Sequence, residues 1–550
     1  MENAIFIPEP AIINRPLNSA PRYGYVTSAK LEGIAGQVIG IEASITTGLP
    51  ITKIVGMADQ AVREAMNRIR AALVYAGETL PRGRITINLR PGWLPKGGTG
   101  YDLPIALAII TAVNGNSGVG SIGAVGELSL QGDILPVQGL LPQVQAIYRE
   151  DVSYIFVPAS NISELVSLDD PRILGIEHLK EALEIIRSQE RFPAVAEDRA
   201  QKRIRQRKLD QNNRFEPINL PGTLRPNLYL RDLPGQRMAI RGLTAACAGG
   251  HHTLLIGSPG CGKTVLAGFA GALMPPLEKS VSTELLSIYS AAGLLNKVAS
   301  TRYYPPIRHP HYTISVPNLI GGGINPKPGE ISLAHGGILF IDEITSAAPA
   351  TLSAMRLPLD IGYIELIRQY RSYKFPCQFI LIGAANPCPC GNLLDQDNQT
   401  KCLCSSGSIT HYHRKLEGAF ADRIDIRIEV HKLSSNDLEL TLKKANWIPV
   451  DKLQNQVIEA RAMQRRRNGV NINQTTILNS NLPTDVLPEK LQLSKDGKRQ
   501  AVRYAKLLNL SIRSFYKLLR LARTFADLDG SNAIETIHLA EALQYKQSQN

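Results

Sequence analysis

Residues 257–264 read Gly257-Ser258-Pro259-Gly260-Cys261-Gly262-Lys263-Thr264, a complete GxxxxGK[ST] spacing. An apolar run, Thr253–Ile256, precedes the stretch, and a helical pattern, Val265–Leu273, follows it. A strand, a glycine-rich turn and a helix in this order predict a phosphate-binding loop, in which backbone N–H groups and the helix N-terminus face the phosphates. We expect Lys263 to pair with the β- and γ-phosphates of a nucleotide and the hydroxyl of Thr264 to ligate Mg²⁺.

Two further apolar runs are each expected to form a strand with a polar end. Residues 337–341 end in the acid pair Asp342 and Glu343, and residues 379–385 end at Asn386. Beside a phosphate loop, Asp342 is expected to hold Mg²⁺ through water, and Glu343 to polarise the attacking water. The amide of Asn386 is expected to orient that water or to sense the γ-phosphate. Taken alone, an acid pair at a strand end would be read as a solvated turn.

Two arginines are candidates for balancing the charge of the phosphates. Arg423 stands in the stretch Phe420–Asp425, and Arg513 stands in Leu510–Arg513. If the chain assembles as a ring, one of them reaches the γ-phosphate held by a neighbouring subunit and the other senses the nucleotide state. Without the surrounding motifs, each would be an ordinary surface arginine.

The composition is that of a globular protein with a polyanionic partner. The 550 residues are 44% hydrophobic and 20% charged, and the formal net charge is +13. The length predicts several domains, and the positive balance favours nucleic acid, although many basic proteins bind none. The longest apolar stretch, Leu103–Val113, is too short to cross a bilayer, and the N-terminus lacks the pattern of a signal peptide. We expect a cytoplasmic protein with no membrane partner.

Changes of composition predict how the chain is divided. Residues 1–22 form an N-terminal extension, and residues 23–187 combine β-rich runs with helical patterns, an α+β arrangement. Residues 188–228 are polar and basic, which predicts a linker. Strands and helices alternate from 229 to 432, the pattern of an α/β fold with a parallel sheet, and residues 433–550 are helical and basic. The strands and helices expected within the α+β region are Gln37–Thr47, Arg84–Leu89, Asp59–Tyr75 and Leu103–Val113.

Several short motifs resemble the magnesium-chelatase branch of the AAA+ ATPases. They are Arg308–His311, Gly321–Gly323, Pro326–His335, Asn386–Gly391, Leu521–Leu528 and His538–Leu543. Within this branch the chain is most similar to the ComM/YifB family, from about residue 23 onwards. The resemblance implies an AAA+ P-loop parallel sheet with a C-terminal helical lid, and an ATPase that uses ATP and Mg²⁺ with Asn386 as its first sensor.

The N-terminal region resembles the Lon-protease-like domain of that family. The similar stretches are Gly48–Pro50, Ile54–Asp59, Arg84–Leu89 and Leu94–Lys96. True Lon proteases use a Ser–Lys dyad, in which the lysine activates the serine. Here Gly100 stands where the nucleophile is expected and Leu141 where the lysine is expected. We therefore expect an inactive domain, with Thr99, one residue away, as the remaining candidate nucleophile.

The family resemblance also implies a partner, because ComM-like proteins are hexameric DNA motors that drive branch migration while transforming DNA is integrated. Single-stranded or branched DNA and further copies of this chain are the implied partners. A hairpin is expected at Ile364–Lys374, where related motors line their pore, and Arg368, Arg371 and Lys374 would grip phosphates there. A solvated edge hairpin is the alternative. Basic residues of the C-terminal helices agree with a DNA partner; they are Arg465–Arg467, Lys498–Arg499, Arg520 and Arg523.

Four of the seven cysteines lie in one short segment. Cys388, Cys390, Cys402 and Cys404 have the spacing C-x-C-x11-C-x-C. Four thiolates in a loop of this size can close a tetrahedral Zn²⁺ site beside the sensor residue. Because C-x-C pairs are less typical of zinc than C-x2-C pairs, free buried thiols and a redox-labile pair remain alternatives.

Three other functions stay open. The chelatase motifs fit the motor subunit of a metal-chelatase-type or protein-remodelling complex, although the Lon-like region and the basic charge argue against metal insertion. An ATP-dependent protease is disfavoured by the missing dyad. A nucleotide-gated adaptor with little turnover is disfavoured by the intact acid pair, Asp342 and Glu343.

Overall fold

The computed structural model describes residues 21–115, 121–165, 167–168, 170–187, 236–295, 304–368, 371–394, 401–414, 420–432, 450–470 and 475–546. The expected linker, 188–228, lies outside the described residues, as does nearly all of the expected N-terminal extension. Contacts divide the described chain into two compact units. The first holds the residues up to 187 with 289–295, and the second holds 236–288 with the residues from 304 onwards.

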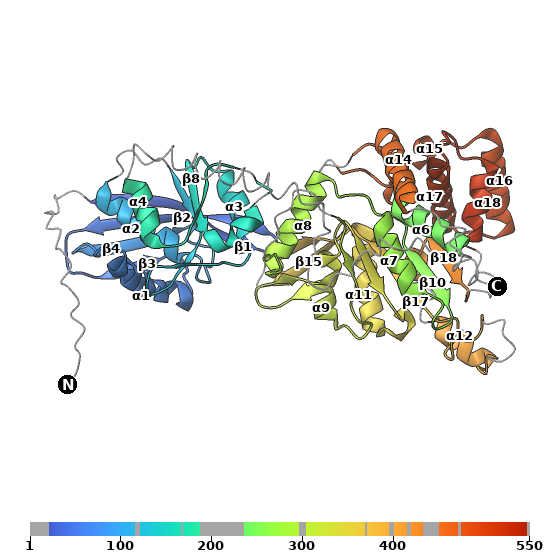
Figure 1. Ribbon diagram of the computed structural model, residues 1–550, viewed down its shortest axis with the longest axis horizontal. Helices are drawn as coiled ribbons and strands as arrows, with labels where there is room; N and C mark the ends of the chain where they lie inside the picture. Colours follow the sequence, from blue (N-terminus) through green and yellow to red (C-terminus); the bar gives the residue numbers. More distant parts are fainter. Residues whose placement is uncertain are drawn as a thin grey trace. The chain divides into compact units, whose positions relative to one another are not determined.

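The first unit is built on a mixed seven-stranded sheet, blue to teal in Figure 1. Its strands are β1 (Arg22–Glu32), β2 (Ala35–Thr46), β3 (Thr52–Val55), β4 (Arg84–Arg90), β5 (Ile122–Ala124), β8 (Tyr154–Pro158) and β9 (Ile173–Ile176). They lie in the order β3-β4-β2-β1-β5-β8-β9. The pairs β1–β2 and β2–β4 are antiparallel and the other neighbours are parallel. A short antiparallel ribbon, β6 (Glu127–Leu128) and β7 (Ile134–Leu135), follows β5 along the chain.

Helices pack on this sheet because their sequences supply caps and apolar faces. They are α1 (Gln60–Tyr75), α2 (Asp102–Asn114), α3 (Leu140–Tyr148) and α4 (Leu179–Arg187). The side chain of Asp59 accepts a hydrogen bond from the N–H of Val62 and so caps α1. Helix α2 is apolar on nearly all sides and is almost wholly buried, packed on β1 and β2. Its one buried carboxylate, Asp102, is paired with Arg68 at 2.6 Å.

The second unit contains a five-stranded sheet in which all strands are parallel. The strands are β10 (Thr253–Gly257), β11 (Ile307–Arg308), β14 (Ile338–Ile341), β17 (Ile380–Ala385) and β18 (Ile426–Val430). Their order is β11-β14-β17-β10-β18. Two small ribbons accompany the sheet, β12 (Gly321–Gly322) with β13 (Lys327–Pro328) and β15 (Tyr363–Arg368) with β16 (Arg371–Pro376).

The helices of the second unit follow the strands and then form a C-terminal layer, orange to red in Figure 1. They are α6 (Arg237–Gly249), α7 (Lys263–Leu273), α8 (Lys279–Ala292), α9 (Val316–Ile320), α10 (Glu330–Leu333), α11 (Pro349–Ile361), α12 (Ser406–Arg414), α14 (Val450–Asn468), α15 (Leu487–Lys490), α16 (Lys495–Leu507), α17 (Ile512–Leu528) and α18 (Thr536–Gln544). One hydrophobic cluster joins sheet residues such as Phe340 to Leu518 and Phe525 of α17. The C-terminal helices therefore share a core with the sheet.

This architecture confirms the sequence-based fold class, a parallel α/β core with a C-terminal helical layer and an α+β unit before it. The expected strands and helices are found with ends shifted by one or two residues. Among the described helices, none combines the length and the apolar character that crossing a membrane requires.

Candidate nucleotide site, paired arginines and thiolate cluster

The phosphate loop lies between the carboxyl end of β10 and the start of α7. Gly262 has φ = 94°, a left-handed conformation that favours glycine, and it is the N-cap residue of α7. The side chain of Lys263 is buried, and its Nζ donates to the carbonyl oxygens of Gly257 at 2.6 Å and Ser258 at 3.1 Å. The loop is thus folded around its own ammonium group, with the helix N-terminus behind it.

The acid pair lies beside this loop, at the carboxyl end of β14. The Thr264 hydroxyl donates to Oδ2 of Asp342 at 3.1 Å, so the two expected Mg²⁺ ligands are neighbours. Glu343 adopts a left-handed backbone conformation with φ = 47°, and its N–H donates to Oδ1 of Asp342 at 2.9 Å. A non-glycine residue held in this conformation is often found at functional sites.

The amide of Asn386 completes the group because β17 lies between β14 and β10. Its Oδ1 accepts from Nζ of Lys263 at 3.2 Å. The carboxyl ends of parallel neighbours meet at one edge of a sheet, and that edge is where ligands bind in open α/β folds. The structure therefore brings together the phosphate loop, the acid pair and Asn386.

Arg423 and Arg513 lie at the opposite edge of the same sheet. Arg423 precedes β18, which is in parallel register with β10 so that Ile426 lies opposite Thr253. At about 3.3 Å per residue, a five-residue strand separates the two edges by roughly 16 Å. Both guanidinium groups approach Asp360 on α11, Arg513 at 3.4 Å. The two arginines thus share the carboxylate of Asp360, at the edge of the sheet away from the phosphate loop of their own chain.

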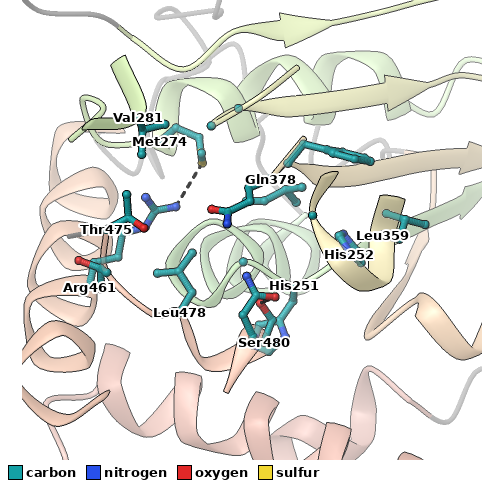
Figure 2. Close-up of a pocket in the computed structure, with 18 of the residues that line it drawn as sticks. His251, His252, Met274, Val281, Leu359, Gln378, Arg461, Thr475, Leu478 and Ser480 are labelled. Atoms are coloured by element: carbon teal, nitrogen blue, oxygen red, sulfur yellow. Dashed lines mark hydrogen bonds between the residues drawn. The ribbon is translucent and has the colours of Figure 1, made fainter. Parts of the chain in front are cut away.

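A cavity of about 740 Å³ opens between this amino edge and the C-terminal helices. Arg423 and Arg513 are among its lining residues. Figure 2 shows its interior, where Arg461 points toward Met274 and Gln378 stands across from Leu478. The Arg461 guanidinium donates to the carbonyl oxygen of Cys247 at 2.7 Å, and burial lowers its pKa. This cavity is a feature of the interface between sheet and lid and lies away from the phosphate loop.

The expected hairpin is present as β15 and β16, and its side chains alternate between buried and exposed positions. The side chains of Ile364 and Leu366, both on β15, are buried. Arg368 and Lys374 are exposed, and the Lys374 ammonium lies 5.2 Å from the centre of the Tyr363 ring. The third expected contact residue, Arg371, pairs with Arg368 across the ladder and is partly buried.

Two of the C-terminal basic residues, Arg467 and Arg523, have a different role from the one expected. Arg523 is fully buried and bonds to Asp527, and Arg467 donates to the same carboxylate at 2.6 Å. Asn479 bonds to Asp527 as well. These two arginines are therefore structural. The expectation that they add to a DNA surface is wrong for both of them. Arg499, by contrast, is 81% exposed.

The four clustered cysteines converge. The Sγ of Cys388 lies 3.3 Å from that of Cys390 and 3.6 Å from that of Cys402, and Cys404 joins them so that all four sulfurs lie within 4.8 Å. Cys388 is buried and Cys390 is exposed. A hydrogen bond from the N–H of Asn392 lowers the pKa of the Cys390 thiol to about 6, which favours a thiolate. Such a group can hold a metal ion.

Tyr412 is a residue of this region that sequence reasoning missed. It stands on α12, just after the cysteines, and its hydroxyl lies 2.5 Å from Oγ1 of Thr345, two residues after Glu343. Burial raises its pKa, against hydrogen bonds from Thr345 and from the backbone of Asn386. The neighbouring His413 bonds to the carbonyl oxygen of Pro387 at 3.0 Å. No local pattern marks this role, because α12 is short and polar.

In the Lon-like unit the dyad is missing in space as well as in sequence. Gly100 and the buried Leu141 carry no reactive group. The Thr99 hydroxyl contacts the carboxylate of Glu127. The Lys96 ammonium donates to the carbonyl oxygens of Leu89 and Pro91, and burial lowers its pKa. Among the described contacts of Thr99, none is with a lysine.

Comparison with known proteins covers most of the chain. Residues 229–438 match the family described as "Magnesium chelatase, subunit ChlI", residues 41–161 match "Subunit ChlI of Mg-chelatase", and residues 449–546 match its C-terminal family. The Competence protein ComM of Haemophilus influenzae is 32% identical over 517 residues, covering 94% of this chain and 95% of ComM. YifB of Escherichia coli is 32% identical with the same coverage.

The chain belongs to the ComM/YifB family of magnesium-chelatase-like AAA+ ATPases. Part of it is also similar to a Lon protease of Mycolicibacterium smegmatis, 30% identical over 172 residues, which are 30% of this chain and 22% of that protein. Membership in this family implies that the second unit is an ATPase that uses ATP and Mg²⁺. The first unit keeps a Lon-like fold.

Proposed function

We propose that this chain is an ATP-driven DNA motor that works in the cytoplasm as a homo-hexameric ring. The observation that carries the proposal is the hairpin β15–β16, which exposes Arg368 and Lys374. Residues 377–379 alone separate β16 from β17, and Asn386 follows β17 at once. A change at the γ-phosphate that shifts Asn386 is therefore transmitted along one strand to the hairpin, where cations can grip DNA phosphates.

The ring is supported by the position of the paired arginines. Arg423 and Arg513 share Asp360 at the edge of the sheet away from their own phosphate loop. An arginine that stabilises the charge of the transferred phosphoryl group must reach it directly. A second copy of the chain supplies such arginines when its amino edge faces the first copy's phosphate loop.

The DNA substrate is supported by the relative named Competence protein ComM, to which this chain is similar over nearly its whole length. The family resemblance implies a role while transforming DNA is integrated. We infer that the motor drives branch migration during this integration. A motor for metal insertion or protein remodelling is the second candidate, favoured by the match to the magnesium-chelatase family over residues 229–438.

The test is steady-state ATPase activity with and without a four-way DNA junction, together with strand displacement. Wild type is compared with Glu343→Gln and with Arg368→Ala/Lys374→Ala. We expect DNA to stimulate the wild type strongly, and the hairpin variant to keep its basal ATPase while DNA stimulation falls by about tenfold or more. Arg63→Ala/Arg70→Ala, which removes two exposed cations from α1 of the first unit, serves as the matched control. An active ATPase that ignores every DNA would overturn the proposal in favour of the second candidate.

We further propose that the thiolate cluster binds Zn²⁺. A tetrahedral ion with Zn–S bonds near 2.3 Å sets its sulfurs about 3.8 Å apart. The three resolved Sγ–Sγ contacts, 3.3 to 3.6 Å, are close to this value. Four cysteines without other ligands fit a structural site, in which the ion supplies cross-linking and no chemistry of its own.

A further inference from the structure

The thiolate cluster lies next to three parts of the ATPase site. Asn386, whose side chain accepts from Lys263, is separated from the buried Cys388 by Pro387 alone. The first arm of the cluster, Cys388 and Cys390, is therefore a direct continuation of the sensor. Any displacement of this arm reaches Asn386 through two peptide bonds.

The same arm also rests on the phosphate loop. Gly391 has φ = 86°, and a Cβ placed on it would lie 2.6 Å from Cδ and 2.9 Å from Cγ of Pro259. The backbone of Gly391 thus packs directly on the Pro259 ring, with no room for a side chain. The cluster and the phosphate loop are in contact at this point.

The second arm, Cys402 and Cys404, leads into α12, which touches the remaining part of the site. Tyr412 contacts Thr345 and the backbone of Asn386, and His413 bonds to Pro387. Helix α12 has no fully buried side chain. Hydrophobic burial, which is the usual source of helix stability in a protein, therefore contributes little to its position. A cross-link between the two arms would hold it in place.

We propose that the loaded thiolate cluster is a positioning device for ATP hydrolysis, which aligns Asn386 and the acid-pair turn through Tyr412. This inference rests on the proposed zinc site. Nucleotide binding depends mainly on the loop amides and Lys263, which keep their own contacts without the cluster. Hydrolysis depends on the placement of the attacking water, and misplacing a reacting group by about 1 Å costs on the order of a hundredfold in rate.

The experiment uses the full-length protein and three measurements: bound zinc per chain, affinity for a fluorescent ATP analogue, and kcat for ATP hydrolysis. The main variant is Cys402→Ser/Cys404→Ser, which removes the second arm and leaves the residues beside Asn386 unchanged. We expect it to lose zinc and at least about tenfold in kcat, while its nucleotide affinity changes less than about threefold. Cys404→His leaves Cys402 in place and replaces one thiolate ligand by an imidazole ligand. This variant should therefore keep both its zinc and its kcat.

Two further variants separate coupling from folding. Tyr412→Phe removes only the hydroxyl, so it should retain zinc and nucleotide affinity and still lower kcat. Ser406→Ala, which also removes one hydroxyl from an exposed position of α12, is the matched control and should change nothing. A melting curve accompanies each variant. A parallel loss of melting temperature, nucleotide affinity and kcat would indicate a merely structural role and overturn the inference.

The remaining outcomes distinguish this inference from the proposals beneath it. If Cys402→Ser/Cys404→Ser loses zinc while its kcat is unchanged, the positioning role is overturned. The proposal that the wild-type cluster binds zinc is then still supported. A wild-type protein that hydrolyses ATP and holds no zinc overturns the zinc proposal itself, and the inference with it. Neither result bears on whether DNA stimulates the ATPase.

Discussion

The ammonium of Lys263 donates to the side-chain oxygen of Asn386 across 3.2 Å, although the two residues are 123 positions apart. The contact joins the first residue of α7, which follows β10 through the phosphate loop, to the residue after β17, a neighbour of β10 in the parallel sheet. A γ-phosphate bound by Lys263 would compete for this ammonium and so change the surroundings of Asn386. The amide can therefore report whether the third phosphate is present.

Replacing Asn386 by Ala should separate binding from hydrolysis. Lys263 keeps its bonds to Gly257 and Ser258, so nucleotide affinity should change by less than about threefold, while kcat falls by about a hundredfold because a group that orients the water is lost. Equilibrium titration with a fluorescent ATP analogue and steady-state phosphate release measure the two quantities. A loss of affinity with an unchanged kcat would show that Asn386 acts in binding alone.

Glu343→Gln should bind ATP and fail to hydrolyse it. Glutamine has the same shape and suits the same backbone, but it cannot accept a proton from the attacking water, a contribution of about a hundredfold or more. The measurement is single-turnover hydrolysis with ATP and Mg²⁺. Glu429→Gln, an exposed carboxylate on β18, is the control and should retain full activity. A variant that hydrolyses ATP at the wild-type rate would remove Glu343 from the mechanism.

Mixing two inactive variants should restore ATPase activity if the paired arginines act on a neighbouring subunit. Lys263→Ala removes the phosphate ligand of its own chain, and Arg423→Ala removes the arginine offered to the next chain. In a mixed ring some sites combine an intact loop with an intact arginine, so activity should rise above that of either protein alone. The summed activities of the Lys263→Ala and Arg423→Ala proteins, each assayed alone, give the baseline. Activity that stays at the level of the separate variants would contradict action in trans.

Asp425 should make the second unit sensitive to acid. Burial alone would raise its pKa, but Lys517 at 2.8 Å and His251 at 3.2 Å outweigh burial and hold the pKa well below its usual range. A lowered folded pKa contributes stability that is present above the unfolded value near 4 and is lost as the pH falls through the folded pKa. Asp425→Asn should therefore cost about 3 kcal/mol at pH 7.

The measurement for Asp425 is urea unfolding of wild type and variant at pH 7 and at pH 3. The difference between the two proteins should shrink at the lower pH, because below the unfolded pKa the unfolded wild-type chain takes up a proton that the folded carboxylate does not. Glu429→Gln controls for the loss of one negative charge on the same segment. A difference that is equal at both pH values would show that Asp425 contributes packing and no charge.

The Lon-like unit should show no peptidase activity. The described side-chain partner of Thr99 is the carboxylate of Glu127, and Lys96 is bonded to two carbonyl oxygens, so neither supplies the lysine that activates the nucleophile in a Lon dyad. Casein should remain intact in the presence of ATP and Mg²⁺, and Thr99→Ala should leave the ATPase rate unchanged. ATP-dependent casein cleavage that disappears in Thr99→Ala would restore the protease interpretation.

Local features of the site could be predicted from the sequence because they depend on neighbouring residues. Gly262 permits the left-handed turn that opens α7, and an apolar strand that ends in Asp342 places a carboxylate at the edge of a sheet. Asp59 caps α1 in the same local way. The hairpin followed from alternation over a few residues, a pattern that a two-stranded ribbon reproduces directly.

The sequence by itself determined the phosphate loop, the acid pair, the sensor amide and the family, since each is written in a short run whose backbone preferences are local. The tertiary structure alone decided which distant groups meet. Arg423 and Arg513 share one carboxylate, Arg523 is buried against Asp527, and Tyr412 reaches the turn after the acid pair. These contacts depend on the order of strands in the sheet and on how the C-terminal helices pack against it, and no short-range periodicity specifies either.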